Sequence, residues 1–93
     1  MSRVELVQRA RREVLDLDRP LSDAVIEALG TLEREPEAGH ALRRRLHGLR
    51  PLRVGAYRII YQFRIIYQFD DNHRVVRVLA VRHRSVAYTT GPR

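Results

Sequence analysis

The spacing of apolar residues changes along the chain and divides it into a helical first half and a sheet-forming second half. Residues 3–7 alternate polar and apolar side chains, which is typical of a short strand. From residue 8 onward, apolar side chains recur three or four positions apart, as on one face of a helix. This first set consists of Ala10, Val14 and Leu17. A second set predicts another helix, which ends at about Glu35, and it consists of Leu21, Val25, Leu29 and Leu32.

The ends of the two predicted helices carry residues that interrupt or cap helices. Pro20 breaks the first helix, and Ser22 or Asp18 is placed to cap the second. Pro36 and Gly39 end the second helix. Because the connection between the two helices is short, we expect them to be antiparallel neighbours.

The second half is rich in β-branched and aromatic residues. Residues 49–63 predict two strands, with Gly55 at the turn between them. After a turn at residues 70–72, residues 75–81 predict a third strand, one face of which is expected to hold Val76, Val78 and Ala80. The order of strand, helix, helix and three strands predicts a single small α+β domain over residues 1–93, with a mainly antiparallel sheet.

The composition excludes several classes of protein. Ninety-three residues are too few for two hydrophobic cores. The absence of cysteine excludes disulfides, zinc–thiolate sites and thiol catalysis. No segment is apolar over enough residues to cross a bilayer, and the charged first residues do not form a secretory signal. We therefore expect a cytoplasmic protein without a membrane partner.

Positive charge is concentrated in the second half of the chain. All eighteen basic side chains are arginine. Residues 1–42 contain six arginines and nine acidic residues, a net charge of −3, whereas residues 43–93 contain twelve arginines and two aspartates, a net charge of +10. Such a segment attracts a polyanion, and the guanidinium fork can hold a phosphate with two hydrogen bonds. We expect an anionic partner; a merely solvated basic face is the alternative.

Three stretches of the second half form a familiar combination. They are LHGLRPLRVGAYRIIY, the acidic pair Asp70 and Asp71, and VVRVLAVRHRSVAY. Together with the opening VELVQRARREVLDL, they resemble the RelE/ParE superfamily of bacterial toxins from type II toxin–antitoxin systems. The resemblance covers most of the chain and implies the small α+β fold of that family. It also implies a cognate antitoxin as a partner, with an acidic segment laid over the basic face of the sheet.

For RelE-like members, the resemblance further implies a ribosome-dependent endoribonuclease that cuts messenger RNA without a metal or cofactor. The ribose 2′-hydroxyl attacks the adjacent phosphate, so fixed cations must stabilise the charge that builds on the phosphate oxygens. One proton must leave the attacking hydroxyl, and another must reach the departing oxygen.

The resemblance assigns catalytic roles to four residues of this chain. Arg58 matches the strand arginine that stabilises the phosphate and the transition state. Arg84 matches the second catalytic arginine, and Tyr88 matches a tyrosine that stacks on a base or helps proton transfer. His83 is either an acid–base group or a histidine that packs beside the last strand.

Six further arginines are candidates for contacts with the RNA backbone. They are Arg50, Arg53 and Arg64 on predicted strands, and the consecutive Arg43, Arg44 and Arg45, for which simple solvation is the alternative. No metal is expected, because the remaining histidines do not form a ligand spacing with an acidic partner.

The chain departs from the family pattern at several positions, and these keep other functions open. Ala56 stands where aspartate is common, Arg82 where glycine is common, and Pro51 where several nucleolytic members have a basic residue. ParE-like members of the same fold inhibit DNA gyrase instead of cutting RNA. A non-catalytic nucleic-acid-binding module is the third alternative, although it explains the charge and not the motifs.

The hexapeptide Arg-Ile-Ile-Tyr-Gln-Phe occurs twice in succession, at residues 58–63 and 64–69. Because six is even, both copies present the same side chains to the same face of a strand. Either one strand continues through both copies, or one copy pairs while the other is extruded as a bulge or loop, and we expect the extrusion. A hairpin between the copies is rejected, since residues 62–65 contain no turn-forming residue.

The repeat leaves open which arginine occupies the site. Arg58 keeps its distance to Gly55, whereas Arg64 keeps the distance to the acidic turn, and we expect Arg58, with Arg64 as the substitute. A continuous strand would have an apolar edge that invites strand-mediated homodimers. We also expect the repeat to weaken or abolish toxicity.

Overall fold

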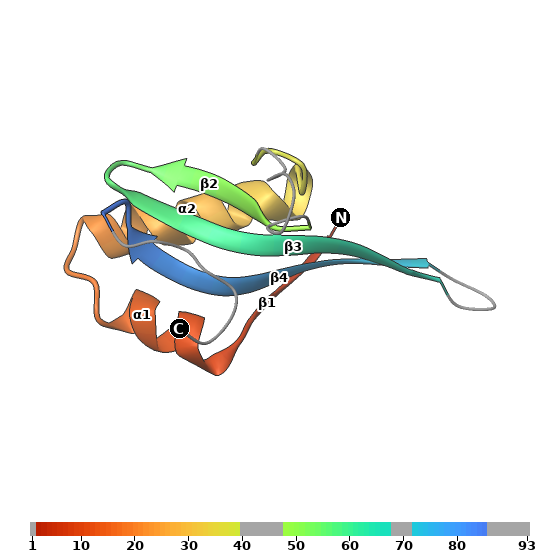
Figure 1. Ribbon diagram of the computed structural model, residues 1–93, viewed down its shortest axis with the longest axis horizontal. Helices are drawn as coiled ribbons and strands as arrows, with labels where there is room; N and C mark the ends of the chain where they lie inside the picture. The colour runs from red at the N-terminus through yellow and green to blue at the C-terminus, as the bar shows by residue number, and fades with distance from the viewer. Residues whose placement is uncertain (1, 40–47, 68–71, 86–93) are drawn as a thin grey trace.

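The computed structural model describes residues 2–39, 48–67 and 72–85, which form a sheet and two helices (Figure 1). The elements follow in the order β1 (Arg3–Leu6), α1 (Gln8–Leu15), α2 (Leu21–Arg34), β2 (Arg50–Val54), β3 (Tyr57–Tyr67) and β4 (Asn72–His83). The predicted α+β order of one strand, two helices and three strands is confirmed. Neither of the described helices is long and apolar enough to cross a membrane.

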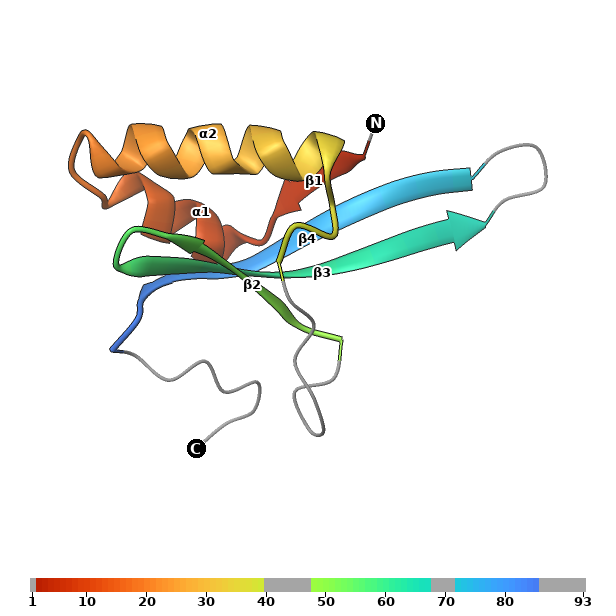
Figure 2. The same ribbon diagram turned by 90° about the horizontal axis from the view of Figure 1, so that it is seen from above.

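The four strands form one mixed sheet in the order β1-β4-β3-β2. β1 pairs in parallel with β4, while β3 pairs in antiparallel fashion with both β4 and β2. Both helices lie on the same face of the sheet, and no helix of the described chain lies on the other (Figure 2). We call this side, which neither described helix covers, the open face.

One side of each helix packs against the sheet, as the apolar spacing predicts. The buried residues are Ala10 and Val14 from α1 and Val25 and Leu32 from α2. Their partners in the sheet are Ile59, Tyr61, Val76, Val78 and Val81. Burying one such aliphatic side chain contributes about 1.5–3 kcal/mol relative to leaving it exposed, so this cluster holds the helices to the sheet.

The start of α2 differs from the prediction, because no side chain caps it. The backbone supplies the hydrogen bonds instead. The Ser22 N–H donates to the Asp18 carbonyl oxygen at 3.0 Å, and the Ala24 N–H donates to the Pro20 carbonyl oxygen at 3.1 Å. The helix therefore begins on carbonyl acceptors and not on the side chains of Ser22 or Asp18.

A β-bulge in β4 corrects the predicted faces of this strand. Ile60 pairs with Ala80, but the next residue, Tyr61, pairs with Val78, which leaves Leu79 without a partner on β3. The extra residue reverses the alternation of side chains beyond it. The helix-facing residues of β4 are therefore Val76, Val78 and Val81. Ala80 packs with Ile60 on the open face, so the prediction that it shares a face with Val78 is wrong.

The repeat extends the sheet as an arm that β2 does not reach and that β1 borders only along residues 75–77 of β4. β3 runs without interruption through the first copy into the second, and β4 reaches a length of twelve residues beside it (Figure 1). We define the arm as residues 62–67 of β3 paired with residues 72–77 of β4. β2 begins at Arg50, opposite Tyr61, so β3 has no strand on its other side from Gln62 onward in the described chain. The expected extrusion of one copy is wrong.

Continuous pairing is favoured because it satisfies the backbone groups of the second copy. An extruded copy would lose these partners and expose its apolar side chains. β4 can match the added length because Val75 and Val76 suit an extended strand. What remains is partial exposure of Ile65 and Ile66, which are 41% and 43% exposed.

The buried Tyr61 anchors the segment that follows α2. Its hydroxyl accepts a hydrogen bond from the Gly39 N–H at 2.9 Å and donates one to the Pro36 carbonyl oxygen at 2.8 Å. Burial raises the pKa of this hydroxyl above its ordinary value of 10.0. Gly39 lies so close to the sheet that a Cβ atom there would stand 2.6 Å from the Pro51 carbonyl oxygen. The first copy of the repeat, and not the second, therefore holds this segment in place.

Candidate nucleic-acid interface

Three arginines lie next to one another across the sheet. Arg58 on β3 pairs with Arg53 on β2 and with Arg82 on β4. Residues that pair directly across strands point to the same face, so these side chains form one row, which we call the arginine row. Arg53 is exposed, and Arg58 and Arg82 are half-buried.

The arginine row lies on the open face. Arg58 stands two residues before Ile60, and side chains two apart on a strand share a face. Ile60 packs with Leu49 and Ala80, apart from the core under the helices. No described helix covers this side of the sheet (Figure 2). The arginine row therefore lies on the side of the sheet that faces away from both described helices.

Glu13 of α1 compensates one end of the arginine row. Like charges directly opposite one another destabilise a sheet. Glu13 Oε2 lies 3.6 Å from Arg82 Nε, and Oε1 accepts a hydrogen bond of 2.8 Å from the Val81 N–H. The pairing of β1 with β4 stops at Val78, so Glu13 also satisfies a backbone donor beyond the end of β1. This carboxylate thus positions both Arg82 and the edge of β4.

Arg84 is held at the end of the sheet where β3 begins. Its backbone N–H donates to the Ala56 carbonyl oxygen at 2.7 Å, which ties it to the turn between β2 and β3. Gly55 in this turn has a φ of 58°, a left-handed conformation that favours glycine. The bond uses only the backbone of Ala56, so the residue type at position 56 leaves it intact. The exposed Arg84 therefore adjoins the strand end that carries Arg58.

His83 faces away from the arginine row. It pairs with Tyr57, which packs against the core under the helices, and the two rings meet edge to face with centroids 5.3 Å apart. The Ser85 N–H donates to His83 Nδ1 at 3.1 Å. His83 Nδ1 also lies 2.8 Å from Ser85 Oγ, and which of these two atoms donates depends on the tautomer of the ring. The ring of His83 is therefore held between Tyr57 and Ser85, on the helix side of the sheet.

Arg50 and Arg64 lie apart from the arginine row. Arg50 pairs with the helix-facing Tyr61, and its Nη1 donates to the Gly39 carbonyl oxygen at 2.9 Å. Its Nη2 lies 3.5 Å from Glu37 Oε2, so the structure gives Arg50 a role in holding the segment after α2. Arg64 shares the face of Arg58 but lies in the arm, opposite Val75. The structure thus brings Arg53, Arg58 and Arg82 together and leaves Arg50 and Arg64 outside.

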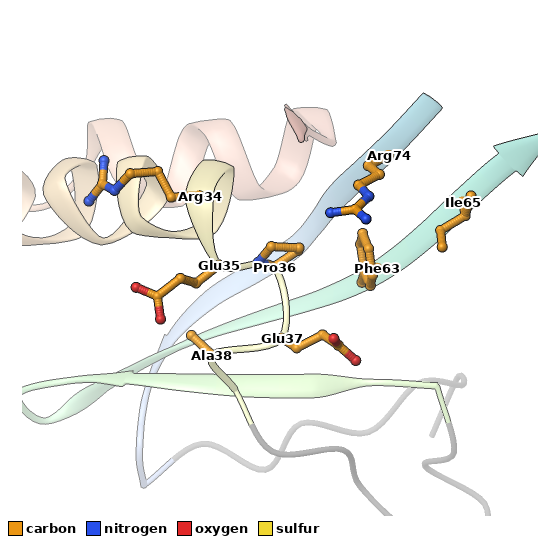
Figure 3. A pocket seen from close by; sticks show the side chains of 8 residues that line it. All are labelled: Arg34, Glu35, Pro36, Glu37, Ala38, Phe63, Ile65 and Arg74. Atoms are coloured by element: carbon orange, nitrogen blue, oxygen red, sulfur yellow. The ribbon is translucent and has the colours of Figure 1, made fainter. Parts of the chain in front are cut away.

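A groove of about 500 Å³ lies on the helix side of the arm (Figure 3). Phe63 and Ile65 from β3 and Arg74 from β4 line one side, and residues 34–38 line the other. Carboxylates and guanidinium groups are mixed along its walls, without a convergent cluster of one sign. The groove therefore belongs to the arm and is separate from the arginine row.

A comparison with protein families identifies the chain. A family model described as the ParE toxin of the type II toxin–antitoxin system, parDE, matches residues 4–88. The chain belongs to the RelE/ParE family of type II toxins. The resemblance that the motifs suggest is thereby confirmed.

Individual relatives of this RelE/ParE-family toxin come from Mycobacterium tuberculosis. Toxin RelG of strain ATCC 25618 / H37Rv is 39% identical over 87 residues, which cover 91% of this chain and 93% of the relative. Toxin RelE of the same strain is 31% identical over 91 residues, covering 96% of this chain and 88% of the relative. A chain in the crystal structure of the RelBE2 toxin–antitoxin complex superposes with a TM-score of 0.71 at 36% identity, covering 89% of this toxin and 98% of that chain.

Several predicted site residues of the toxin lie outside the described residues. They are Tyr88 and the consecutive Arg43, Arg44 and Arg45. Within residues 2–39, 48–67 and 72–85, no three histidine or acidic side chains come together as ligands for a metal ion. The roles of these four residues stay predictions.

The sequence patterns missed two residues of the toxin's interface. Arg82 stands out in the sequence only as a departure from a glycine, yet it completes the arginine row opposite Arg58. Glu13 reads as a solvated residue on the polar side of α1, yet it holds Arg82 and the Val81 N–H. The alignment of β3 with β4 is the signal that would have found Arg82, whereas Glu13 depends on where α1 packs.

Proposed function

We propose that this toxin is a metal-independent, ribosome-dependent endoribonuclease that cleaves messenger RNA in the cytoplasm and so inhibits translation. The observation that carries the proposal is the arginine row on the open face. Three arginines that pair across neighbouring strands place positive charge on this face, which suits the phosphate backbone of RNA, although Glu13 offsets part of it at Arg82. The relatives named toxin RelG and toxin RelE support the RelE-like activity.

In this proposal the arginines stabilise charge and other groups move protons. The 2′-hydroxyl of one ribose attacks the adjacent phosphorus, and the 5′-oxygen of the next nucleotide leaves. Arg58 and Arg84 stabilise the negative charge on the phosphate oxygens, while Arg53 and Arg82 hold the neighbouring backbone. Tyr88 is the first candidate for these proton transfers, and His83 is the second, although it pairs with Tyr57 on the helix side of the sheet.

The partner that silences the toxin is a cognate antitoxin with an acidic segment, which binds over the open face. A likeness to a chain solved within a toxin–antitoxin complex supports this partner. Opposite charge on the two surfaces would speed association and exclude RNA from the same arginines. The net charge of +10 on residues 43–93 is the feature that such an acidic segment would neutralise.

The arm is the feature that weakens the activity in this proposal. It projects beyond β2 on one side and beyond the start of β1 on the other (Figure 1). An extension of the sheet of this length would restrict entry into a confined site such as the decoding centre. The arginine row itself is intact, so the expected effect of the repeat is a steric reduction of toxicity.

Induced expression with mapping of messenger RNA ends tests the proposal. We expect cuts phased with codons from the chain without residues 64–69, and fewer from the 93-residue chain. In the chain without residues 64–69, which has no second copy of this arginine, Arg58→Ala should reduce cleavage by about 10²–10³, the usual loss for one group that stabilises developing charge. Arg11→Ala is the matched control, because Arg11 is exposed on α1, away from the open face, and should cleave normally. Equal cleavage by both variants would contradict a role for Arg58.

Inhibition of DNA gyrase is the second candidate, and the ParE description of the matching family model favours it. It predicts growth arrest with DNA damage and without codon-phased cuts. Gel assays of DNA supercoiling by purified gyrase, with and without the toxin, would separate the two functions. Arrest without either effect would remove both candidates.

A further inference from the structure

The two copies of the repeat can occupy the same place in the sheet. Residues 58–63 and 64–69 are identical, and an aromatic residue precedes each copy, Tyr57 for the first and Phe63 for the second. In the structure the first copy pairs with β2 and with the C-terminal half of β4. It supplies Arg58 to the arginine row. Nothing in the side chains of the copies themselves distinguishes this register from one displaced by six residues.

We propose that Arg64 is an alternative occupant of the place of Arg58, brought there when β3 slips by six residues against β2 and β4. In the slipped register Arg64 lies between Arg53 and Arg82 and completes the arginine row. Ile65 replaces Ile59 and a tyrosine again follows two positions later, while Phe63 replaces Tyr57, so each helix-facing place keeps an aliphatic or aromatic side chain. This inference does not rest on the proposed function, because it concerns only the register of the sheet.

The slip exchanges the arm for a longer turn. The pairs from Arg64 with Val75 to Tyr67 with Asn72 are lost, and the groove lined by Phe63 and Ile65 disappears with them. The turn between β2 and β3 grows from residues 55–56 to residues 55–62. Loop-closure entropy rises only slowly with loop length, so the longer turn is not a large penalty.

Two features set the balance between the registers. The tight turn with Gly55 in its left-handed conformation favours the observed register. The slip buries Ile65 and Ile66, which are 41% and 43% exposed, at the places of Ile59 and Ile60, but it takes those two buried residues out of the sheet, so burial does not favour the slipped register and this register is the minor one. Ile59 and Ile60 enter the longer turn in exchange. Exchange between the registers requires β3 to detach from both neighbours, as in local unfolding.

Cysteine cross-linking tests the slipped register directly, since the chain contains no cysteine. In the observed register residue 53 lies opposite residue 58, and residue 64 is about 20 Å farther along β3 at the usual rise per residue. A disulfide requires Cα atoms within about 7 Å. Arg53→Cys with Arg64→Cys can therefore cross-link only in the slipped register. The pair Arg53→Cys with Arg58→Cys cross-links in the observed register.

The matched control is Arg53→Cys with Ile65→Cys. The separation along the chain is nearly the same, but in the slipped register residue 65 points to the opposite face from residue 53. We expect the 53/64 pair to oxidise about tenfold faster than the 53/65 pair in native buffer, because only the Cβ atoms of the 53/64 pair can converge. Mass spectrometry measures the disulfide formed by each pair. The difference should vanish in urea. Equal, slow oxidation of the two pairs, with rapid closure of the 53/58 pair, would overturn the proposal.

A rescue experiment provides a second measurement. Ile59 is fully buried, so Ile59→Asp is incompatible with the observed register. In the slipped register residue 59 enters the longer turn and Ile65 fills the core. We expect Ile59→Asp to keep a cooperative thermal transition by circular dichroism and Ile59→Asp/Ile65→Asp to lose it, while Ile65→Asp alone folds. If Ile59→Asp is as unfolded as the double variant, the second register is not available and the proposal fails.

Discussion

Gly39 offers a sharp test of how the segment after α2 is seated on the sheet. A Cβ atom at this position would lie 2.6 Å from the Pro51 carbonyl oxygen and 3.0 Å from the Tyr61 hydroxyl. Neither neighbour can move freely, because Pro51 belongs to β2 and the hydroxyl bonds the Gly39 N–H. Overpacking of this kind costs about 1–3 kcal/mol, and losing the hydrogen bond adds about 1 kcal/mol. We expect Gly39→Ala to lower the free energy of unfolding by about 2–4 kcal/mol.

Gly30→Ala is the control, since it makes the same chemical change in open space. Gly30 lies inside α2, and an added Cβ atom there has no heavy atom within 4 Å. Alanine is more favourable than glycine in a helix interior by about 1 kcal/mol, so this variant should be more stable than the parent chain.

Urea denaturation followed by circular dichroism measures both variants. For a chain of this size, each 1 kcal/mol corresponds to about 4–8 °C in Tm, so thermal melts give an independent comparison. We expect glycine-to-alanine substitution to lower the free energy of unfolding at position 39 and to raise it at position 30. If Gly39→Ala matches the parent chain, the close approach to Pro51 and Tyr61 does not exist in solution. If Gly30→Ala destabilises, the placement of Gly30 in α2 is wrong.

Three further predictions follow from other parts of the structure. Gly55→Ala should lower stability by about 1–2 kcal/mol in urea melts, because Gly55 has a positive φ; an unchanged midpoint would place another residue at this turn position. Glu13→Ala should cost about 1 kcal/mol by removing the acceptor of the Val81 N–H, whereas Glu13→Gln should retain it; equal losses in both variants would refute the bond. Burial raises the pKa of Tyr61 above 10.0, so the folded chain keeps a proton that the unfolded chain releases. Stability should be unaffected by Tyr61 below pH 10.0 and fall as the pH rises above it, with a smaller fall in Tyr61→Phe; identical pH profiles would contradict this.

Much of the candidate site could be predicted from the family resemblance, but its arrangement could not. Arg53 and Arg58 lie together on the open face, and Arg84 adjoins them at the turn. His83 lies on the opposite side of the sheet, because residues alternate faces along a strand and His83 pairs with Tyr57. A motif such as Val-Arg-His-Arg records which residues are present and does not record which face each one takes.

The bulge at Leu79 shows why alternation read from the sequence alone fails within one strand. The run from Val78 to Val81 is apolar, and Val78, Ala80 and Val81 are buried although they face both sides of the sheet, so no polar residue marks the point where the pattern shifts. The shift arises because β3 and β4 pair with different registers on the two sides of Leu79. Pairing between distant segments, and not local preference, therefore decided that Ala80 faces away from the helices.

By itself the sequence determined the elements, their order and the basic second half of the chain. Helical spacing and the β-branched runs follow from local preferences that act over a few residues, and structure confirms them. Only the tertiary structure decided which copy of the repeat pairs with β2 and which copy extends the sheet. Two identical copies have identical local preferences, so their places depend on the turn at Gly55 and on the ability of β4 to pair along the added length. That long-range pairing put Arg58 in the arginine row and Arg64 in the arm.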